Sequence, residues 1–466
     1  MIKNGMGKNS RLSLPDLQSR ARAFLSSRTY RVTHRESAAI APCKIYHVEL
    51  SGEIPDLPAQ PGYVKVFVVL WWHQIPLGHL ELTAGELPLS AANLGNLAIE
   101  TITAAVGAHL LPQGFTVPLS EHFKREVVAP DLHAVLAIET PLALLAQRWS
   151  MEKDKGELQT CSVVICTRDR VEQLAQCLES ILSLAQRPDE IIVVDNAPRT
   201  DKTRKLVAQM PEVRYVLEPR PGLSVARNTG IRHCTGEIIA FTDDDVLVHP
   251  DWITRIKQSF QDPIVMAVTG LVLPAELETE AQVIFEVELG HFGWGYHTKT
   301  FDQQFFNATK RLGVPVWRIG AGANMAFRRE VFDLVGGFDE RLGAGAAGCS
   351  EDSELWYRIL AGGWSCRYEP APVAFHVHRR EFIDLQKQVY YYMRGHVTAL
   401  LVQFAKHRHW GNLFRLCLVL PLYYAKLFAS GLLRGYGPRH KVLMTEVAGC
   451  IAGLKFYWQH CRTENK

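Results

Sequence analysis

The stretch EIIAFTDDDV, residues 237–246, places three aspartates directly after a short apolar run. The run has the composition of a buried strand, and Asp243, Asp244 and Asp245 follow it at its carboxyl end. In open α/β folds, ligands bind at the edge of the sheet where parallel strands end. Adjacent carboxylates repel one another, so we expect this edge to hold a divalent cation together with a phosphate ligand, because hard cations take carboxylate and phosphate oxygens.

Upstream of this stretch, apolar β-branched runs alternate with segments whose apolar residues recur at helical spacing. Strands that alternate with helices imply parallel pairing through right-handed crossovers. The sequence therefore predicts an α/β protein with a mostly parallel sheet flanked by helices. The predicted strands are residues 162–166, 190–195, 213–217 and 237–241, and the predicted helices are residues 171–184, 200–210 and 223–233.

Polar residues also follow the other predicted strands at the points where those strands end. Thr167, Arg168 and Asp169 follow the first strand, and Asp195 closes the second. Because parallel strands end at a common edge, we expect these side chains to line the same site as the three aspartates.

Six blocks of sequence occur in a fixed order between residues 160 and 400: SVVICTRDR, IIVVDNAP, EPRPGLSVARNTGI, EIIAFTDDDV, GAGANMAFRREVFDLVGGFDERLGAG and SEDSELWYRILAGG. In order and spacing they resemble the nucleotide-sugar-dependent family 2 glycosyltransferases, which have the Rossmann-like GT-A fold. One such match would be weak evidence, whereas six in the family's order are specific. The sequence excludes a Rossmann dehydrogenase and a P-loop ATPase, since no G-x-G-x-x-G follows the first strand and no G-K-[ST] loop precedes a helix.

The resemblance implies a donor site at the edge of the sheet. Asp195 is where the family holds the nucleotide base, Arg227 approaches the nucleotide or its phosphates, and Asp243 and Asp245 form a D-x-D pair that reaches the ribose and the metal. The nucleotide-sugar-binding residues expected from the resemblance are Thr167, Arg168, Asp169, Asp195, Arg227, Asp243 and Asp244.

The pair Glu351-Asp352 stands just before an apolar helical pattern over residues 355–360. Acidic side chains are stabilised at a helix N-terminus, which gives the pair a purely structural interpretation. By resemblance, Asp352 is the family's catalytic base and Glu351 belongs to the same catalytic pair.

The segment His376-Val377-His378 follows a predicted strand over residues 372–375. Two histidines at this spacing are metal ligands or hydrogen-bonded side chains. The family often has a histidine that contacts the metal or diphosphate here, so His376 and His378 join Asp243 and Asp245 as expected metal ligands, with the choice between the two histidines open. Arg379 and Arg380 add positive charge near phosphates or lie on a solvated face.

These observations predict a metal-dependent, inverting glycosyltransferase that uses Mn²⁺ or Mg²⁺ and a nucleotide-diphosphate sugar. The expected acceptor is a glycan or a lipid-linked molecule in cell-surface glycan or glycolipid synthesis, with no nucleic-acid partner. By resemblance, Asn324, Phe338 and Asp339 belong to the acceptor side, although a tight turn explains them equally well. The family's Q-x-x-R-W signature of processive enzymes is absent, which favours single transfer. Two alternatives stay open: a metal-dependent nucleotide-sugar phosphohydrolase and a non-catalytic nucleotide-sugar-binding protein.

The composition indicates the compartment. Ten cysteines form no C-x-x-C pair and look reduced, and the basic N-terminus has no apolar signal region, so we expect a cytoplasmic protein. Residues 376–466 carry 14 Lys and Arg against 4 Asp and Glu, although the net charge of the whole chain is only +3.

Three regions are expected along the chain. Residues 1–150 form a small α/β accessory domain, with a hairpin of strands over residues 63–72 and 78–82 and a helix over residues 132–149 before a charged linker at 152–157. Residues 158–405 form the glycosyltransferase domain, and residues 406–466 form a basic helical region.

The apolar segment 413–433 is interrupted by Arg415, Pro421 and Lys426, and its longest uncharged stretch is too short to cross a bilayer. We expect an interfacial helix that contacts anionic lipid at the inner face of the cell membrane, the alternative being a helix packed on the catalytic domain. A second such helix is expected over residues 442–458.

Overall fold

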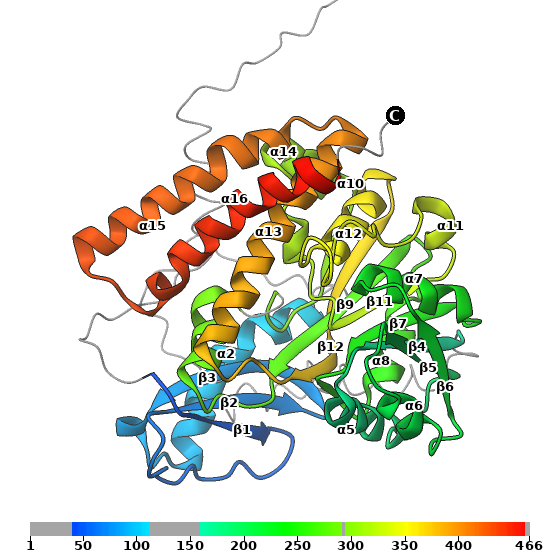
Figure 1. The fold of residues 1–466 in the computed structure, drawn as a ribbon. Helices are drawn as coiled ribbons and strands as arrows, with labels where there is room; N and C mark the ends of the chain where they lie inside the picture. The colour runs from blue at the N-terminus through cyan, green and yellow to red at the C-terminus, as the bar shows by residue number, and fades with distance from the viewer. Residues whose placement is uncertain (1–39, 111–158, 291–293, 462–466) are drawn as a thin grey trace, which may run out of the picture. The chain divides into compact units, whose positions relative to one another are not determined.

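A computed structural model of the 466-residue chain describes residues 40–110, 159–290 and 294–461. All of these residues belong to one compact unit that begins at Ile40. Its centre is a nine-stranded sheet with the order β10-β12-β9-β11-β7-β4-β5-β6, to which β8 is added beside β12. Helices cover this sheet, and a separate three-stranded sheet belongs to the N-terminal part (Figure 1).

The parallel half of the large sheet confirms the four strands predicted upstream of the aspartates. β4 lies between β5 and β7 and is parallel to both, and β6 extends the sheet beyond β5. The buried side chains of α5 recur at helical spacing and pack on this half of the sheet. The bounds are β4 Cys161–Thr167, α5 Val171–Leu182, β5 Glu190–Asn196, α6 Lys202–Val207, β6 Val213–Glu218, α7 Leu223–His233 and β7 Ile238–Asp243.

The other half of the sheet is mixed. β11 is antiparallel to both β7 and β9, whereas the long strand β12 is parallel to β9 and antiparallel to β8 and β10. The predicted strand over residues 372–375 is the last part of β12. The bounds are β8 Val246–Val248, α8 Trp252–Ser259, β9 Val265–Pro274, α9 Glu280–Val283, η3 Ile284–Gly290, β10 Lys299–Phe301, α10 Gln303–Thr309, β11 Asn324–Arg328, α11 Val331–Val335, α12 Glu351–Ala361 and β12 Ser365–His376.

The N-terminal sheet differs from its prediction at the hairpin. The expected five-residue loop over residues 73–77 is a tight turn at His73 and Gln74, both with positive φ, and Pro76 lies inside β3. β3 is an edge strand, where a residue without an N–H is tolerated. The bounds are β1 Cys43–Glu49, β2 Lys65–Trp72, β3 Ile75–Thr83, η1 Ala84–Glu86 and α2 Ala91–Leu110. The predicted helix 132–149 and linker 152–157 lie outside the described residues.

The N-terminal sheet shares its core with the large sheet. Phe67, Val69 and Trp71 of β2 belong to the same buried cluster as side chains of β9 and β12. The ring of Trp71 stacks on His249, with centroids 5.2 Å apart, and also contacts Phe375, the neighbour of His376. The described part of residues 1–150 therefore supports the strand that ends at His376.

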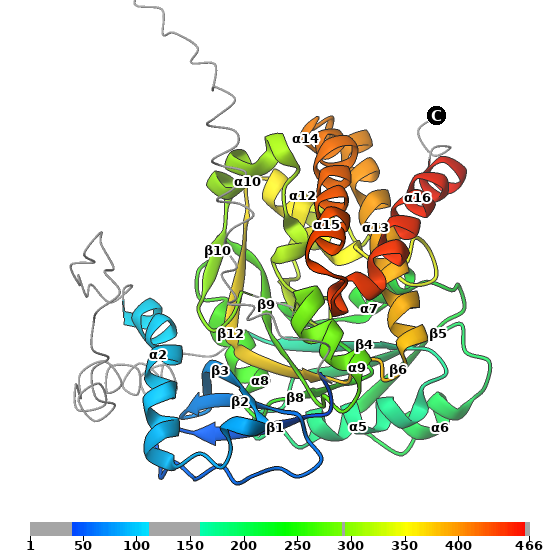
Figure 2. The same cartoon turned by 90° about the vertical axis from the view of Figure 1, so that its left-hand side faces the viewer.

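The C-terminal region is helical, as predicted. α16 packs closely on α13 because Gly449 and Gly453 face the backbone of α13, where a Cβ atom would come within 2.4 Å of the Tyr390 oxygen and 2.6 Å of the Arg394 oxygen. α15 runs beside α16 in both views (Figure 2). The bounds are α13 Phe382–His407, α14 Gly411–Phe414, η6 Arg415–Val419, α15 Leu420–Arg434, η7 Pro438–Val442 and α16 Leu443–His460.

Candidate functional site

The strand ends meet at one edge of the sheet, as their positions in the sequence predict. The pairing of β4 with β5 sets Thr167 opposite Asp195, and the pairing of β4 with β7 sets Cys166 opposite Asp243. Asp169 follows in the left-handed region with a φ of 55°, which aspartate tolerates better than most residues, and it accepts a hydrogen bond from the Arg199 amide.

The three consecutive aspartates face three different partners. Asp243 lies 3.3 Å from the guanidinium of Arg227. Asp244 accepts hydrogen bonds from the Thr167 hydroxyl at 2.7 Å and from Arg170 at 2.6 Å. Asp245 accepts from Arg170 at 3.1 Å and lies 3.5 Å from the Nε2 atom of His376. The repulsion expected between neighbouring carboxylates is thus relieved by separate positive or donor groups.

Arg227 joins the sheet edge to the predicted catalytic pair. This buried residue of α7 donates a 2.5 Å hydrogen bond to Glu351 at the start of α12 while it contacts Asp243 on β7. Gly322 makes the close approach feasible, since a Cβ atom there would lie 3.1 Å from both Arg227 and Asp352. The structure therefore brings Asp243, Glu351 and Asp352 into one cluster around a single guanidinium.

This cluster carries more negative than positive charge. Burial raises the pKa of Asp243 to about 6 and that of Glu351 to about 7, although Arg227 opposes both shifts. Burial likewise raises the pKa of Asp352, one of whose oxygens accepts a 2.6 Å hydrogen bond from its neighbour Ser353. Three carboxylates with one arginine form a site in which a cation or a proton is stabilised.

The four predicted metal ligands do not all meet at one point. Asp245 faces His376, whereas His378 directs its Nδ1 atom to His376 at 2.9 Å and its Nε2 atom to Glu286 at 3.0 Å. Burial lowers the pKa of His376 to about 4, so its ring is neutral at pH 7 and able to ligate. Within the described residues, no three His, Cys, Asp or Glu side chains gather as a ready metal site. The pair Asp245 and His376 nevertheless fits a divalent cation that takes its other ligands from a diphosphate and water, as such cations often do in proteins.

Asp195 has the features expected of a residue that holds a nucleotide base. It is fully buried and accepts a 2.9 Å hydrogen bond from the Tyr215 hydroxyl through one oxygen. The other oxygen is buried and has no hydrogen-bond partner among the described residues. Burial raises the pKa of Asp195, and an N–H donor from a ligand would satisfy the remaining oxygen.

The site contains residues that the sequence did not single out. Arg168, expected at the donor, is exposed, and Arg170 two positions later makes the contacts with Asp244 and Asp245. Both arginines stand in the same TRDR run, so the sequence indicated the right run but did not indicate which of its two arginines contacts the aspartates.

The two arginines after His378 have different partners. Arg379 lies 3.6 Å from Asp245, whereas Arg380 pairs with Glu276.

A cavity of about 370 Å³ opens beside Asp245. It is lined by the first turns of α5, by the turn between β7 and β8, and by the segment that follows β12. Its polar lining includes Arg170, Asp245, His378 and Arg379. The cavity therefore presents positive groups next to the carboxylate that faces His376.

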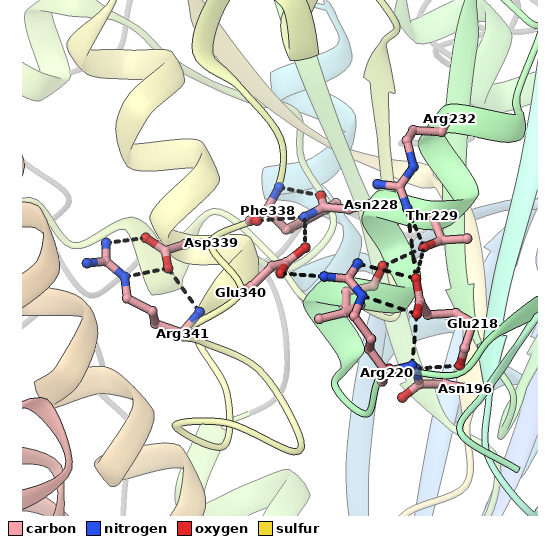
Figure 3. Close-up of polar contacts among 11 residues, drawn as sticks. Asn196, Glu218, Arg220, Asn228, Thr229, Arg232, Phe338, Asp339, Glu340 and Arg341 are labelled. Carbon is pink, nitrogen blue, oxygen red and sulfur yellow. Dashed lines mark hydrogen bonds and ion pairs between the residues drawn. The ribbon is translucent and has the colours of Figure 1, made fainter. Parts of the chain in front are cut away.

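A polar network holds the loops that carry the cluster (Figure 3). Asn228, next to Arg227, exchanges two hydrogen bonds with the backbone of Phe338, at 2.9 and 2.8 Å. Glu218 accepts from the hydroxyl of Thr229, the residue after Asn228 in α7, and from the Arg220 amide, which fixes the loop before α7. The network explains how α7 and the chain leading to α12 keep one relative position.

The three residues expected on the acceptor side make internal contacts instead. Asn324 bonds Trp252 and the backbone of Leu271 and Pro372 inside the sheet. Phe338 is buried, and Asp339 is bonded to Arg341 within its own turn. These contacts favour the structural interpretation that the sequence had left open.

The middle of the chain is similar in sequence to known proteins. Residues 162–336 match the family model described as glycosyl transferase family 2. A glucosyl-dolichyl phosphate glucuronosyltransferase of Haloferax volcanii is 27% identical over 193 residues, which is 39% of this chain and 56% of that protein. The succinoglycan biosynthesis protein ExoM of Rhizobium meliloti is 27% identical over 218 residues, which is 44% of this chain and 63% of that protein.

Less than two thirds of the length of these two relatives is covered by the match. Among solved structures, a mannosyltransferase from Pyrobaculum calidifontis in complex with GDP-Man and Mn²⁺ has a TM-score of 0.45 and 19% identity, over 69% of this chain and 97% of that one.

Proposed function

We propose that this chain, which belongs to glycosyl transferase family 2 through residues 162–336, moves a sugar from a nucleotide-diphosphate sugar to an acceptor hydroxyl with inversion at the anomeric carbon. The observation that carries the proposal is the position of Arg227. Its guanidinium contacts Asp243 at the sheet edge and Glu351 in the predicted catalytic pair, so the expected donor site and the expected base share one cluster.

Asp352 suits the role of the general base. It is half-buried and next to Glu351, and burial raises its pKa, which increases its ability to take a proton from a hydroxyl. The Ser353 amide donates a 2.6 Å hydrogen bond to it, and the nearby charge of Arg227, which Glu351 holds in place, favours its ionised form. A single base with one displacement accounts for inversion.

Asp195 supports the placement of the nucleotide base at the end of β5. Its buried second oxygen is an acceptor for a base N–H, and Thr167 lies opposite it in the sheet register. Arg170 and Arg379 beside Asp245 supply positive charge for the diphosphate, a geometry that guanidinium groups favour.

A divalent cation held by Asp245 and His376 would neutralise the charge that develops on the leaving diphosphate. Because imidazole nitrogen is a poor ligand for Mg²⁺, which takes oxygen atoms, the donor set favours Mn²⁺.

The exposed apolar surface of α15 and α16 supports the proposal that the acceptor is bound to a membrane. Contrary to the expectation from its interrupted apolar run, the continuous helix Gly411–Arg434 is by length and composition apolar enough to cross a membrane, and only 11% of its apolar window is buried in the protein. Arg415, which interrupts the apolar run in the sequence, is itself buried 3.9 Å from the centre of the Trp317 ring and does not interrupt the outer face. Since α15 lies beside α16, we propose that both lie in the interface of an anionic membrane at the cytoplasmic face, which would bring a lipid-linked acceptor to the enzyme.

The test begins with a panel of nucleotide sugars, each added with Mn²⁺, Mg²⁺ or EDTA while thermal unfolding is followed. One nucleotide class should raise the unfolding temperature only with a divalent cation, and Asp243→Asn should abolish that increase. Donor turnover should then depend on an added acceptor. Hydrolysis that proceeds equally well without acceptor would favour a phosphohydrolase, and a stabilisation unaffected by EDTA and by Asp243→Asn would overturn the donor site.

A further inference from the structure

Four buried side chains form a continuous line that extends from the acidic edge into the protein. Asp245 lies 3.5 Å from Nε2 of His376, whose Nδ1 lies 2.9 Å from Nδ1 of His378. Nε2 of His378 lies 3.0 Å from Glu286. All four residues are at most 9% exposed. Glu286 comes from η3, a segment that neither the sequence motifs nor the family match distinguishes by any role.

The number of protons in this line is constrained by its chemistry. A carboxylate only accepts hydrogen bonds, and a neutral imidazole has one N–H and one acceptor nitrogen. The line has a carboxylate at each end and two imidazoles between them. Two neutral imidazoles thus provide two protons for three contacts, and one contact is left without a proton.

The distances indicate which contact lacks the proton. Those between the two histidines and between His378 and Glu286 are within the ordinary range of hydrogen bonds, at 2.9 and 3.0 Å. The contact between His376 and Asp245 is the longest, at 3.5 Å. With Nε2–H of His378 directed at Glu286, Nδ1 of His378 accepts from Nδ1–H of His376, and the lone pair of Nε2 on His376 faces the Asp245 oxygen.

We infer that Glu286 and His378 are positioning residues that select the tautomer of His376 and so create a divalent-cation position between His376 and Asp245. The inference rests on the proposed function, since it assigns two new residues to its metal site. A carboxylate behind a ligating histidine is a known way to fix ring orientation and to increase ligand basicity, and its loss typically lowers metal affinity about 10- to 100-fold. Here the effect passes through a second histidine.

The surroundings of Asp245 agree with this assignment. Arg170 and Arg379 both approach its Oδ2 atom, whereas Oδ1 is the atom that faces His376. The two arginines thus neutralise one oxygen and leave the other directed at the imidazole. The Glu286 side chain is buried among the same elements that hold His378, so it cannot exchange this partner for solvent without a rearrangement.

Glu286→Gln tests the direction in which the hydrogen bonds run along this line of four side chains, which we call the relay. A glutamine amide can donate to His378, which would reverse both hydrogen bonds and place Nε2–H of His376 in the cation position. Glu286→Met removes the acceptor altogether. Glu288→Gln is the matched control, because it makes the same charge change in the same helical segment, at a half-buried residue outside the line.

Two measurements on the full-length protein read out the relay without activity. The first is Mn²⁺ affinity, from the electron paramagnetic resonance signal of free Mn²⁺, with Mn²⁺ alone as the probe. We expect both Glu286 variants to bind at least about tenfold more weakly than wild type and Glu288→Gln to bind normally. The second is the ¹⁵N spectrum of histidine-labelled, metal-free protein, in which His376 should have an unprotonated Nε2 in the wild type and a protonated Nε2 in Glu286→Gln.

Asp245→Asn distinguishes failure of the relay from failure of the proposed metal site. If Mn²⁺ binding depends on Asp245 but is unchanged in both Glu286 variants, the relay is wrong and the proposed metal site stands. If the wild type binds no Mn²⁺ in an Asp245-dependent manner, the cation position is wrong. A doubly protonated His376 in the metal-free wild type at neutral pH also overturns the inference, because a proton then fills the third contact. Should Glu286→Met not fold, Glu286→Gln decides by both measurements.

Discussion

The acidic sheet edge and the outer face of α15 and α16 are incomplete in opposite ways. At the edge, charged groups are buried: Arg227 is 2% exposed and Glu351 is 5% exposed, and the carboxylates outnumber the arginine that joins them. On the helices, apolar groups face outward, with Leu432 64% and Leu433 85% exposed. We expect the kind of deficit to indicate the kind of ligand: a cation and a nucleotide for buried carboxylates, and lipid for exposed leucines.

The largest effect expected at the acidic edge is on catalysis. Asp352→Asn keeps the shape of the side chain but removes its ability to accept a proton. We expect the transfer rate to fall about 10²- to 10⁴-fold, the range for a general base, while donor affinity is retained. The measurement is initial-rate kinetics together with donor binding by calorimetry. Glu340→Gln, at an exposed carboxylate that pairs with Arg220, is the control. An equal loss of donor binding in Asp352→Asn would assign Asp352 to structure instead.

The buried arginine should matter for stability more than any surface arginine. Arg227→Met leaves Glu351 and Asp243 without their shared partner in a buried site. Breaking a buried ion pair in this way costs about 3–5 kcal/mol in unfolding free energy. Arg220→Met, which removes a half-exposed arginine that pairs with Glu218 and Glu340, should cost at most about 1 kcal/mol. Chemical denaturation of both variants measures the difference, and equal costs would contradict the role of Arg227 as the centre of the cluster.

A smaller effect is expected in the pH dependence of stability. Burial raises the pKa of Glu351 from 4.5 to about 7. Between these values the folded protein keeps a proton that the unfolded chain has released, so the contribution of Glu351 to the unfolding free energy falls as the pH rises. Glu351→Gln does not titrate. The variant should therefore gain about 2 kcal/mol relative to wild type between about pH 5 and 7.5, at about 1.4 kcal/mol per pKa unit.

The control for this prediction is Glu340→Gln, whose pH dependence should parallel that of the wild type. Denaturation curves at several pH values give the difference directly. If the curves for Glu351→Gln and wild type stay parallel, Glu351 is ionised throughout, and the excess negative charge of the cluster is relieved in another way.

The sequence predicted the acidic edge well because it depends on local order. Asp195 and Asp243 stand at the ends of strands whose composition is unambiguous, and parallel strands end together, so their meeting follows without knowledge of any side-chain contact. The resemblance added Arg227 and the pair Glu351-Asp352, and in the structure Arg227 contacts both Asp243 and Glu351. What the local pattern did not contain was the antiparallel direction of β11, which only long-range pairing decides.

The residues that were missed act through contacts between distant parts of the chain. Arg170 and Asp245 are 75 positions apart, and Glu286 and His378 are 92 apart. η3 has the irregular geometry of a π-helix, so no simple period identifies the inward face on which Glu286 lies. Arg415 illustrates the reverse error, since a charge that seemed to interrupt an apolar surface is directed into the protein against Trp317.

The smallest effect expected is on membrane affinity, and it tests the other half of the comparison. The double variant Leu432→Glu with Leu433→Glu replaces the two most exposed leucines of α15 with charges. Burial of a leucine side chain contributes about 1.5–3 kcal/mol, so even partial insertion predicts a loss of at least about tenfold in vesicle binding. Leu334→Glu is the matched control, because Leu334 is also exposed, at 53%, but belongs to α11. Sedimentation with sucrose-loaded anionic vesicles gives the affinities.

Wild-type binding should weaken as salt rises, because the basic residues Lys426, Arg434 and Lys455 on these helices are exposed and ions screen them within about 10 Å at 0.1 M. If the double variant and Leu334→Glu bind alike, or wild type ignores anionic vesicles at low salt, the exposed leucines of α15 do not meet lipid, and their exposure has another cause.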